Sequence, residues 1–223
     1  MDGSARANAI ELVIFDHDGV LVDSEIIAME LVSRMLTEAG IPTTVDEAFD
    51  TYLGMSFDAV AEILHAKDPA LDPADFERQF HDELFAGFRD RLEPIPGVRW
   101  LLESLDEAGM PIAIASSGSS ARVDLGITST DLVTFFPDHV RTTRDHVERG
   151  KPFPDLFLLA AERAGVDPAH CVVVEDSPHG IEAARRAGMR VIGLAHRTPA
   201  ARLADADWVV TDARLIGPLI LDA

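Results

Sequence analysis

The chain has little positive charge, almost no lysine and a single cysteine. Its 223 residues include 19 Lys plus Arg against 39 Asp plus Glu, which gives a formal net charge of −20. Nucleic acids and anionic membrane surfaces attract proteins through clustered cations, so this deficit argues against both as partners. With Cys171 as the one cysteine, neither a disulfide within the chain nor a cysteine-based zinc site can form.

Long apolar runs and a leader pattern are also missing. No apolar run approaches the roughly 18 residues of a membrane span. The N-terminal MDGSARANAI lacks the basic-then-apolar order of a signal peptide, so we expect a cytoplasmic protein. Apolar residues make up 47% and charged residues 26%, which is the composition of a globular chain long enough to bury a core.

Short apolar runs alternate with helical patterns over most of the chain. We expect strands at 10–15, 112–115, 171–176, 190–195 and 208–210, with a weaker one near 139–142. Helices are expected at 98–108, 156–164 and 178–188, with a short one from Pro199. Strands that alternate with helices indicate a parallel sheet covered on both faces.

One long block has helical patterns only. Its apolar positions recur every three or four residues in the stretches 27–39, 60–64 and 76–88. Because this block directly follows the first strand, we predict an α/β core of residues 1–23 and 94–223, with residues 24–93 inserted as a helical cap.

Four carboxylates lie at the ends of two predicted strands. Asp16 and Asp18 follow the first strand, and Glu175 and Asp176 end the strand at 171–176. Ligands of open parallel sheets bind at the carboxyl ends of the strands. Four acids gathered there would repel one another unless a cation lay between them, and oxygen ligands suit Mg²⁺. The alternatives are a polar turn for the first pair and acids that stabilise a helix N-terminus for the second.

The spacing of the first pair permits a division of labour. Asp16 and Asp18 are two residues apart, so both side chains leave an extended chain on one side. One can then bind metal and attack while its neighbour exchanges a proton, and Gly19 allows a tight exit. An EF-hand calcium loop is excluded because its twelfth position, counted from Asp16, is Ile27 rather than Glu.

Two other segments are suited to an anion. Ser116 ends the strand at 112–115, and Ser117 with the residues after it can turn backbone N–H groups toward a ligand at a helix start. The alternative is an ordinary helix cap. Lys151 is one of only two lysines, whereas the other 17 cations are arginines. A compact ammonium in such a chain favours a phosphate contact over a solvated surface charge.

Together these segments resemble the haloacid dehalogenase superfamily, in particular its branch of β-phosphoglucomutase-like phosphatases. The matching segments are FDHDGVLVDSE (15–25), IAIASSG (112–118), GKPFPDLF (150–157) and VVVEDSPHGIEAARRAG (172–188). The intervening lengths also fit, so the resemblance covers nearly the whole chain. It implies a Rossmann-like parallel sheet with a helical cap, and a monomeric Mg²⁺-dependent phosphatase that hydrolyses small phosphate esters such as sugar or sugar-acid phosphates.

The resemblance also implies roles for individual residues. Asp16 looks like the nucleophile that forms an aspartyl-phosphate. Asp18 looks like the acid that protonates the leaving oxygen and the base that then activates water. Ser116, Lys151 and the backbone N–H of Ser117 would hold the transferring phosphoryl group. Fixed donors and cations of this kind offset the charge on its oxygens.

The implied metal site uses residues at the ends of the first predicted strand and of the strand at 171–176. The Asp16 carboxylate, the Asp18 backbone carbonyl and Asp176 would hold Mg²⁺, with Glu175 as a ligand or as support. The true dehalogenases lack an Asp at the position of Asp18, because halide needs no leaving-group proton. Hydrolysis of carbon–halogen bonds is therefore disfavoured.

A sugar phosphomutase is the alternative activity. Mutases grip a distal phosphate with a cap arginine in a Gly-x-Ser-Arg pattern, and the corresponding stretch here is Gly-Met-Ser-Phe at 54–57. The basic residues that follow the second-strand serine in mutases fall on 118–120, which carry no cation, and a cap histidine falls on Ala28. Phenylalanine cannot replace arginine in binding phosphate, so hydrolysis is favoured.

A signalling receiver domain is an alternative of another class. Receiver domains also gather acids and a lysine around Mg²⁺ and accept a phosphoryl group on Asp. They are roughly half this length, have no helical cap, and lack a second Asp two residues after the phosphoacceptor, whereas Asp18 is present here.

Overall fold

The computed structural model describes residues 9–53, 55, 57–67 and 72–222. The chain divides into two compact units. One consists of Met1–Val22 together with Glu93–Ala223, and the other is Asp23–Leu92.

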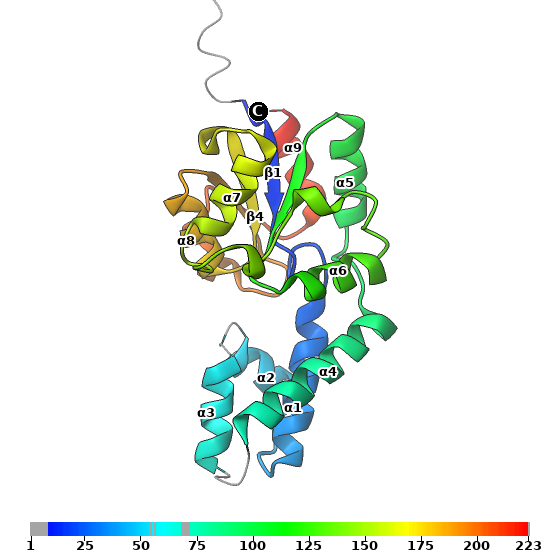
Figure 1. Ribbon diagram of the computed structural model, residues 1–223, viewed down its shortest axis with the longest axis vertical. Coiled ribbons are helices and arrows are strands. Elements are labelled where there is room, and N and C mark those ends of the chain that lie inside the picture. Colours follow the sequence, from blue (N-terminus) through cyan, green and yellow to red (C-terminus); the bar gives the residue numbers. More distant parts are fainter. Residues whose placement is uncertain (1–8, 54, 56, 68–71, 223) are drawn as a thin grey trace, which may run out of the picture. The chain divides into compact units, whose positions relative to one another are not determined.

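The first unit is built on a six-stranded parallel sheet (Figure 1). Its strands are β1 (Leu12–Phe15), β2 (Ile112–Ala115), β3 (Arg141–Thr142), β4 (Cys171–Glu175), β5 (Arg190–Leu194) and β6 (Trp208–Val210). Their order is β3-β2-β1-β4-β5-β6, so the chain runs outward on one side of β1 and then crosses to β4 on the other side. The carboxyl ends of β1 and β4 therefore flank the point where the winding direction changes, which is where open α/β sheets bind ligands.

The parallel α/β architecture predicted from the sequence is confirmed. Each predicted strand is present, and the boundaries agree to within two residues, although β3 is shorter than predicted. That strand is only two residues long and follows a 3₁₀ turn at Asp138–Val140. β1 and β4 are completely buried, which explains their continuous apolar runs of residues.

Helices cover both faces of this sheet. They are α5 (Val98–Glu107), α6 (Ser120–Ser129), α7 (Asp155–Ala164), α8 (Pro178–Arg186) and α9 (Ile216–Leu221). On one face, Leu12 and Ile14 of β1 join a buried cluster with α7 and α8. On the other face, Phe15 packs edge-on against Phe136 at 6.2 Å between ring centroids. Figure 1 shows α5 across the sheet from α7 and α8. The sequence patterns did not delimit α6 or predict α9.

The second unit is helical. It contains α1 (Ser24–Glu38), α2 (Val45–Tyr52), α3 (Phe57–Lys67) and α4 (Pro73–Arg91). In α4 the apolar side chains that recur every four residues are buried, at Phe76, Phe80, Leu84 and Phe88. Helix α2 was not predicted, although Thr44 and Glu47 form a capping box at its start, a pattern that marks a helix N-terminus in sequence. No described helix combines the length and the apolar character needed to cross a bilayer.

The chain leaves and re-enters the α/β unit at one place. Val22 forms an antiparallel bridge with Pro94, and the Ile95 N–H donates to the Leu21 carbonyl oxygen at 3.0 Å. These two contacts close the base of the inserted segment.

Cys171, the first residue of β4, has a buried side chain whose Sγ donates to the Asp167 carbonyl at 3.5 Å. Burial, with Asp167 adding to it, raises the pKa of this thiol to about 11. Because the thiolate is the reactive form, we expect no reaction of the native protein with an aromatic disulfide reagent at pH 8. One thiol per chain should react after unfolding in guanidinium chloride. Rapid titration of the native thiol would contradict this prediction.

Candidate active site

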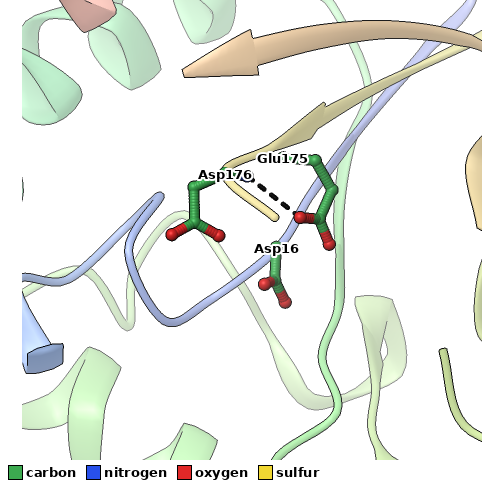
Figure 2. A group of neighbouring side chains, drawn as sticks. All are labelled: Asp16, Glu175 and Asp176. Carbon is green, nitrogen blue, oxygen red and sulfur yellow. Dashed lines mark hydrogen bonds between the residues drawn. The ribbon is translucent and has the colours of Figure 1, made fainter. Parts of the chain in front are cut away.

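Three carboxylates meet at the carboxyl ends of β1 and β4. Asp16 follows β1, Glu175 ends β4 and Asp176 comes directly after it. Ligand oxygens of the three lie within 4.8 Å of one another, and all three residues are buried. Figure 2 shows their side chains grouped at these two strand ends. Parallel pairing of β1 with β4 aligns the strands, and the Asp16 N–H donates to the Val174 carbonyl at 3.0 Å, which fixes the alignment at the site itself.

Both carboxylate oxygens of Glu175 accept hydrogen bonds from the protein. Its Oε2 accepts hydrogen bonds at 2.9 Å from the Asp176 N–H, the Ser177 N–H and the Ser177 hydroxyl (the first is dashed in Figure 2). Its Oε1 accepts from Lys151 Nζ at 2.6 Å. Both oxygens are thus engaged by the protein, so this carboxylate supports the group and orients the turn that carries Asp176.

Lys151 lies between two of the acids. Its Nζ is 2.8 Å from Asp16 Oδ1 and 2.6 Å from Glu175 Oε1, and its side chain is 6% exposed. Burial alone would lower the pKa of Lys151, but the two carboxylates outweigh that effect and raise it above its usual value. The ammonium therefore stays charged and is itself one cation between the predicted acids.

One ammonium does not balance three buried carboxylates. Burial raises the pKa of Asp16 to about 6, Lys151 opposes the rise, and Glu175 and then Asp18 add to it. Because burial is the main cause of this rise, the ionised Asp16 carboxylate is poorly stabilised in the site as it stands. A further cation would lower the energy of the ionised group.

Two glycines make room for these carboxylates. Gly19 has a positive φ of 74°, and a Cβ there would lie 2.0 Å from Asp176 Oδ2. At Gly180 in α8, a Cβ would lie 1.8 Å from the Glu175 carboxyl group. A side chain at either position would force the acid out of place, so the glycines belong to the architecture of the site.

The loop after β2 approaches the same edge of the sheet. Ser116 is buried and its Oγ accepts from the Gly118 N–H at 3.0 Å, whereas Ser117 is exposed. Ser119 caps α6 by accepting from a backbone N–H of its first turn. The helix cap therefore falls on Ser119 and not on Ser116, and the binding of an anion by Ser116 and Ser117 stays a prediction.

Comparison with known proteins identifies the family. The profile of the haloacid dehalogenase-like hydrolases matches residues 13–194. The chain belongs to this family. A phosphorylated carbohydrates phosphatase from Thermotoga maritima is 34% identical over 192 residues, which cover 84% of this chain and 86% of the relative.

Two solved structures are similar to this chain over nearly its whole length. A haloacid dehalogenase-like protein of unknown function from Agrobacterium tumefaciens has a TM-score of 0.85 and 37% identity, and the match covers 96% of this chain and 99% of that one. A candidate β-phosphoglucomutase from Thermotoga maritima has a TM-score of 0.80 and 32% identity, with 96% and 100% covered. The resemblance inferred from the four sequence segments is thereby confirmed.

In this hydrolase the Asp18 carboxylate is not part of the group formed by Asp16, Glu175 and Asp176. Its carboxylate accepts three hydrogen bonds from Arg122 of α6, at 3.2 and 3.0 Å from Nε and 2.8 Å from Nη2. Burial alone would raise the pKa of Asp18, but Arg122, and then His17, hold it well below its usual value. Sequence patterns gave no sign of Arg122, because 104 residues separate it from Asp18.

His17 lies between the two aspartates in the chain and is fully buried. Its Nδ1 lies 3.5 Å from Asp18 Oδ2. The ring fills the space beside Gly126 of α6, where a Cβ would lie 2.3 Å from Nε2. Positions 54 and 56 of the mutase comparison lie outside the described residues.

Proposed function

We propose that this hydrolase is a Mg²⁺-dependent phosphatase of phosphorylated sugars or sugar acids, acting through an aspartyl-phosphate. The observation that carries the proposal is the buried group of Asp16, Glu175 and Asp176 with Lys151 at its side. Its family membership and the carbohydrate phosphatase among its relatives agree with that chemistry.

The donor set fits magnesium. Among the described residues, the side chains grouped here that could bind a metal are all carboxylates, and they hold more negative charge than Lys151 balances. In our proposal Asp16, Asp176 and the backbone carbonyl of Asp18 hold the ion, while the fully hydrogen-bonded Glu175 supports them. When bound, Mg²⁺ supplies positive charge that offsets the charge on the phosphoryl oxygens.

The two aspartates divide the reaction between them. In our proposal the negative phosphate of the bound ester opposes the effect of Arg122 on the pKa of Asp18, so that Asp18 enters the reaction protonated. An Asp16 oxygen then attacks phosphorus, the ester P–O bond breaks, and Asp18 gives the leaving oxygen its proton. Water then attacks the aspartyl-phosphate, Asp18 takes the proton of that water, and inorganic phosphate leaves. Ser116, the Ser117 N–H and Lys151 hold the phosphoryl group in both steps.

We further propose that residues 24–93 act as a cap that selects the substrate, with residues 1–23 and 94–223 as the catalytic core. A net charge of −20 favours a small phosphate ester over nucleic acid or a membrane surface as the partner. We also propose that the enzyme is cytoplasmic and monomeric.

The direct test is a substrate panel. The purified protein would be incubated with Mg²⁺ and hexose phosphates, pentose phosphates, sugar-acid phosphates and non-carbohydrate monoesters, with released phosphate measured. We expect the highest kcat/KM among the carbohydrate esters. Failure to release phosphate from any monoester would reject the function.

Mg²⁺ should stabilise the protein through Asp176. At a concentration about 100 times Kd, bound Mg²⁺ adds about 2.7 kcal/mol to the free energy of unfolding. We expect a rise in melting temperature in wild type, a much smaller rise in Asp176→Asn, and an unchanged rise in the exposed control Asp138→Asn. NaCl at equal ionic strength controls for screening. A full Mg²⁺ effect in Asp176→Asn would remove Asp176 from the metal site.

A sugar phosphomutase is the second candidate. It is favoured by the similarity to the candidate β-phosphoglucomutase and by Arg122, a cation close to Asp18 that the residues at 118–120 do not supply. Interconversion of hexose 1- and 6-phosphates, primed by a hexose bisphosphate and faster than phosphate release, would establish the mutase.

A further inference from the structure

Arg122 binds both oxygens of the Asp18 carboxylate. The guanidinium donates from Nε to both carboxylate oxygens and from Nη2 to Oδ1, so the carboxylate plane is fixed by more than one bond. His17 Nδ1 lies 3.5 Å from Oδ2. The pair is partly buried, with side chains 20% and 25% exposed, which sets it apart from a loose surface ion pair.

The guanidinium is itself held in place by the fold. Gly118 leaves room for the arginine stem, since a Cβ there would lie 3.1 Å from Arg122 Cδ. The start of α6 is anchored, because the Ser120 N–H donates to Asp145 at 2.8 Å. At the far end of α6, Arg99 Nη2 donates to the Thr130 carbonyl at 2.9 Å. The helix thus presents Arg122 from a position fixed at both ends.

We propose that Arg122 is a positioning residue that sets the orientation of the Asp18 carboxylate for proton exchange. The role rests on the proposed phosphatase function. Asp18 acts twice in that mechanism, first on the leaving oxygen and then on water, so one defined orientation serves both steps. An error of about 1 Å in such a group can cost about 100-fold in rate.

Leaving-group dependence separates this role from a merely structural one. The oxygen of a sugar leaves poorly and needs the Asp18 proton, whereas p-nitrophenolate leaves without one. Loss of Arg122 should therefore slow phosphorylation of Asp16 by a sugar phosphate and spare phosphorylation by p-nitrophenyl phosphate. Hydrolysis of the aspartyl-phosphate needs Asp18 whichever ester was used.

The experiment compares Arg122→Ala, Arg122→Lys and the control Arg99→Ala in the full chain with Mg²⁺. We expect Arg122→Ala to lower kcat/KM for the preferred sugar phosphate about 100-fold. Its kcat/KM for p-nitrophenyl phosphate should be nearly unchanged, with a pre-steady-state burst of p-nitrophenolate. Arg122→Lys should recover part of the loss, because an ammonium makes one contact where the guanidinium makes several. Arg99→Ala, which loosens the other end of α6, should keep the wild-type ratio between the two esters.

The outcomes are distinct. Equal losses on both esters, or the same change of ratio in Arg99→Ala, would show a structural role and overturn the proposal. Unchanged kinetics in Arg122→Ala would overturn it as well, and melting curves verify that each variant is folded. A wild type that hydrolyses neither ester would reject the phosphatase itself, whereas an active wild type with an indifferent Arg122 rejects only this role.

Discussion

Replacing Asp16 with Asn is expected to lower kcat for a sugar phosphate by at least about 10⁴-fold, the scale seen when a nucleophile is removed. The amide has nearly the shape of the carboxylate but does not attack phosphorus. Phosphate release under saturating substrate and Mg²⁺ measures the loss, and Asp138→Asn is the exposed control. A variant that kept more than about one hundredth of the wild-type rate would show that another group attacks.

The melting temperature of Asp16→Asn shows whether the variant loses activity because it lacks the nucleophile or because it unfolds. The pKa of Asp16, raised by burial to about 6, exceeds its ordinary value of 3.8, so the folded state binds this proton more tightly than the unfolded state does. Its contribution to stability is complete below pH 3.8 and is lost as the pH rises through 6. Asparagine carries no charge to bury. Without Mg²⁺ at pH 8, Asp16→Asn should melt at or above the wild-type temperature.

Replacing Lys151 with Met should have the largest effect on stability. The ammonium is the shared partner of Asp16 and Glu175, and its removal leaves two buried carboxylates without a protein cation. Breaking a buried ion pair from one side costs about 3–5 kcal/mol. Urea unfolding at pH 8 without metal measures this loss. The control Arg149→Met breaks an exposed pair with Asp155 and should cost at most about 1 kcal/mol.

The effect of Lys151→Met should depend on pH in a defined direction. In wild type Lys151 holds down a pKa that burial has raised to about 6, so without the lysine the pKa of Asp16 rises further. Protonation then neutralises the buried acid as the pH falls through this higher pKa, and the cost of the substitution should shrink toward pH 4. An equal loss at pH 4 and pH 8 would mean that packing of the lysine stem, rather than its charge, stabilises the site.

Much of the fold could be read from local patterns. Buried parallel strands such as Cys171–Glu175 are uninterrupted apolar runs, and their polar ends fall at one edge of the sheet because the strands are parallel. That rule places Asp16 beside Glu175 and Asp176 without coordinates. Helix α2 is short and has only Ala48 buried among its residues, so apolar periodicity could not reveal it.

Two features of the site depend on contacts that no spacing encodes. Lys151 was expected to meet a phosphate, and its rarity drew attention to it, but only the packed site shows its bonds to Asp16 and Glu175. Arg122 is one of 17 arginines and sits in an ordinary amphipathic position, so nothing local distinguished it. Its importance arises when β1 and α6 come together in the folded chain.

The bridge between Val22 and Pro94 has a consequence for the history of such proteins. The two ends of the inserted segment lie next to each other at this bridge. Its sequence can therefore be exchanged by recombination without altering the order or register of the strands. Chimaeras cut at this junction would inherit the reaction from one parent and, under our proposal for the insertion, the choice of substrate from the other.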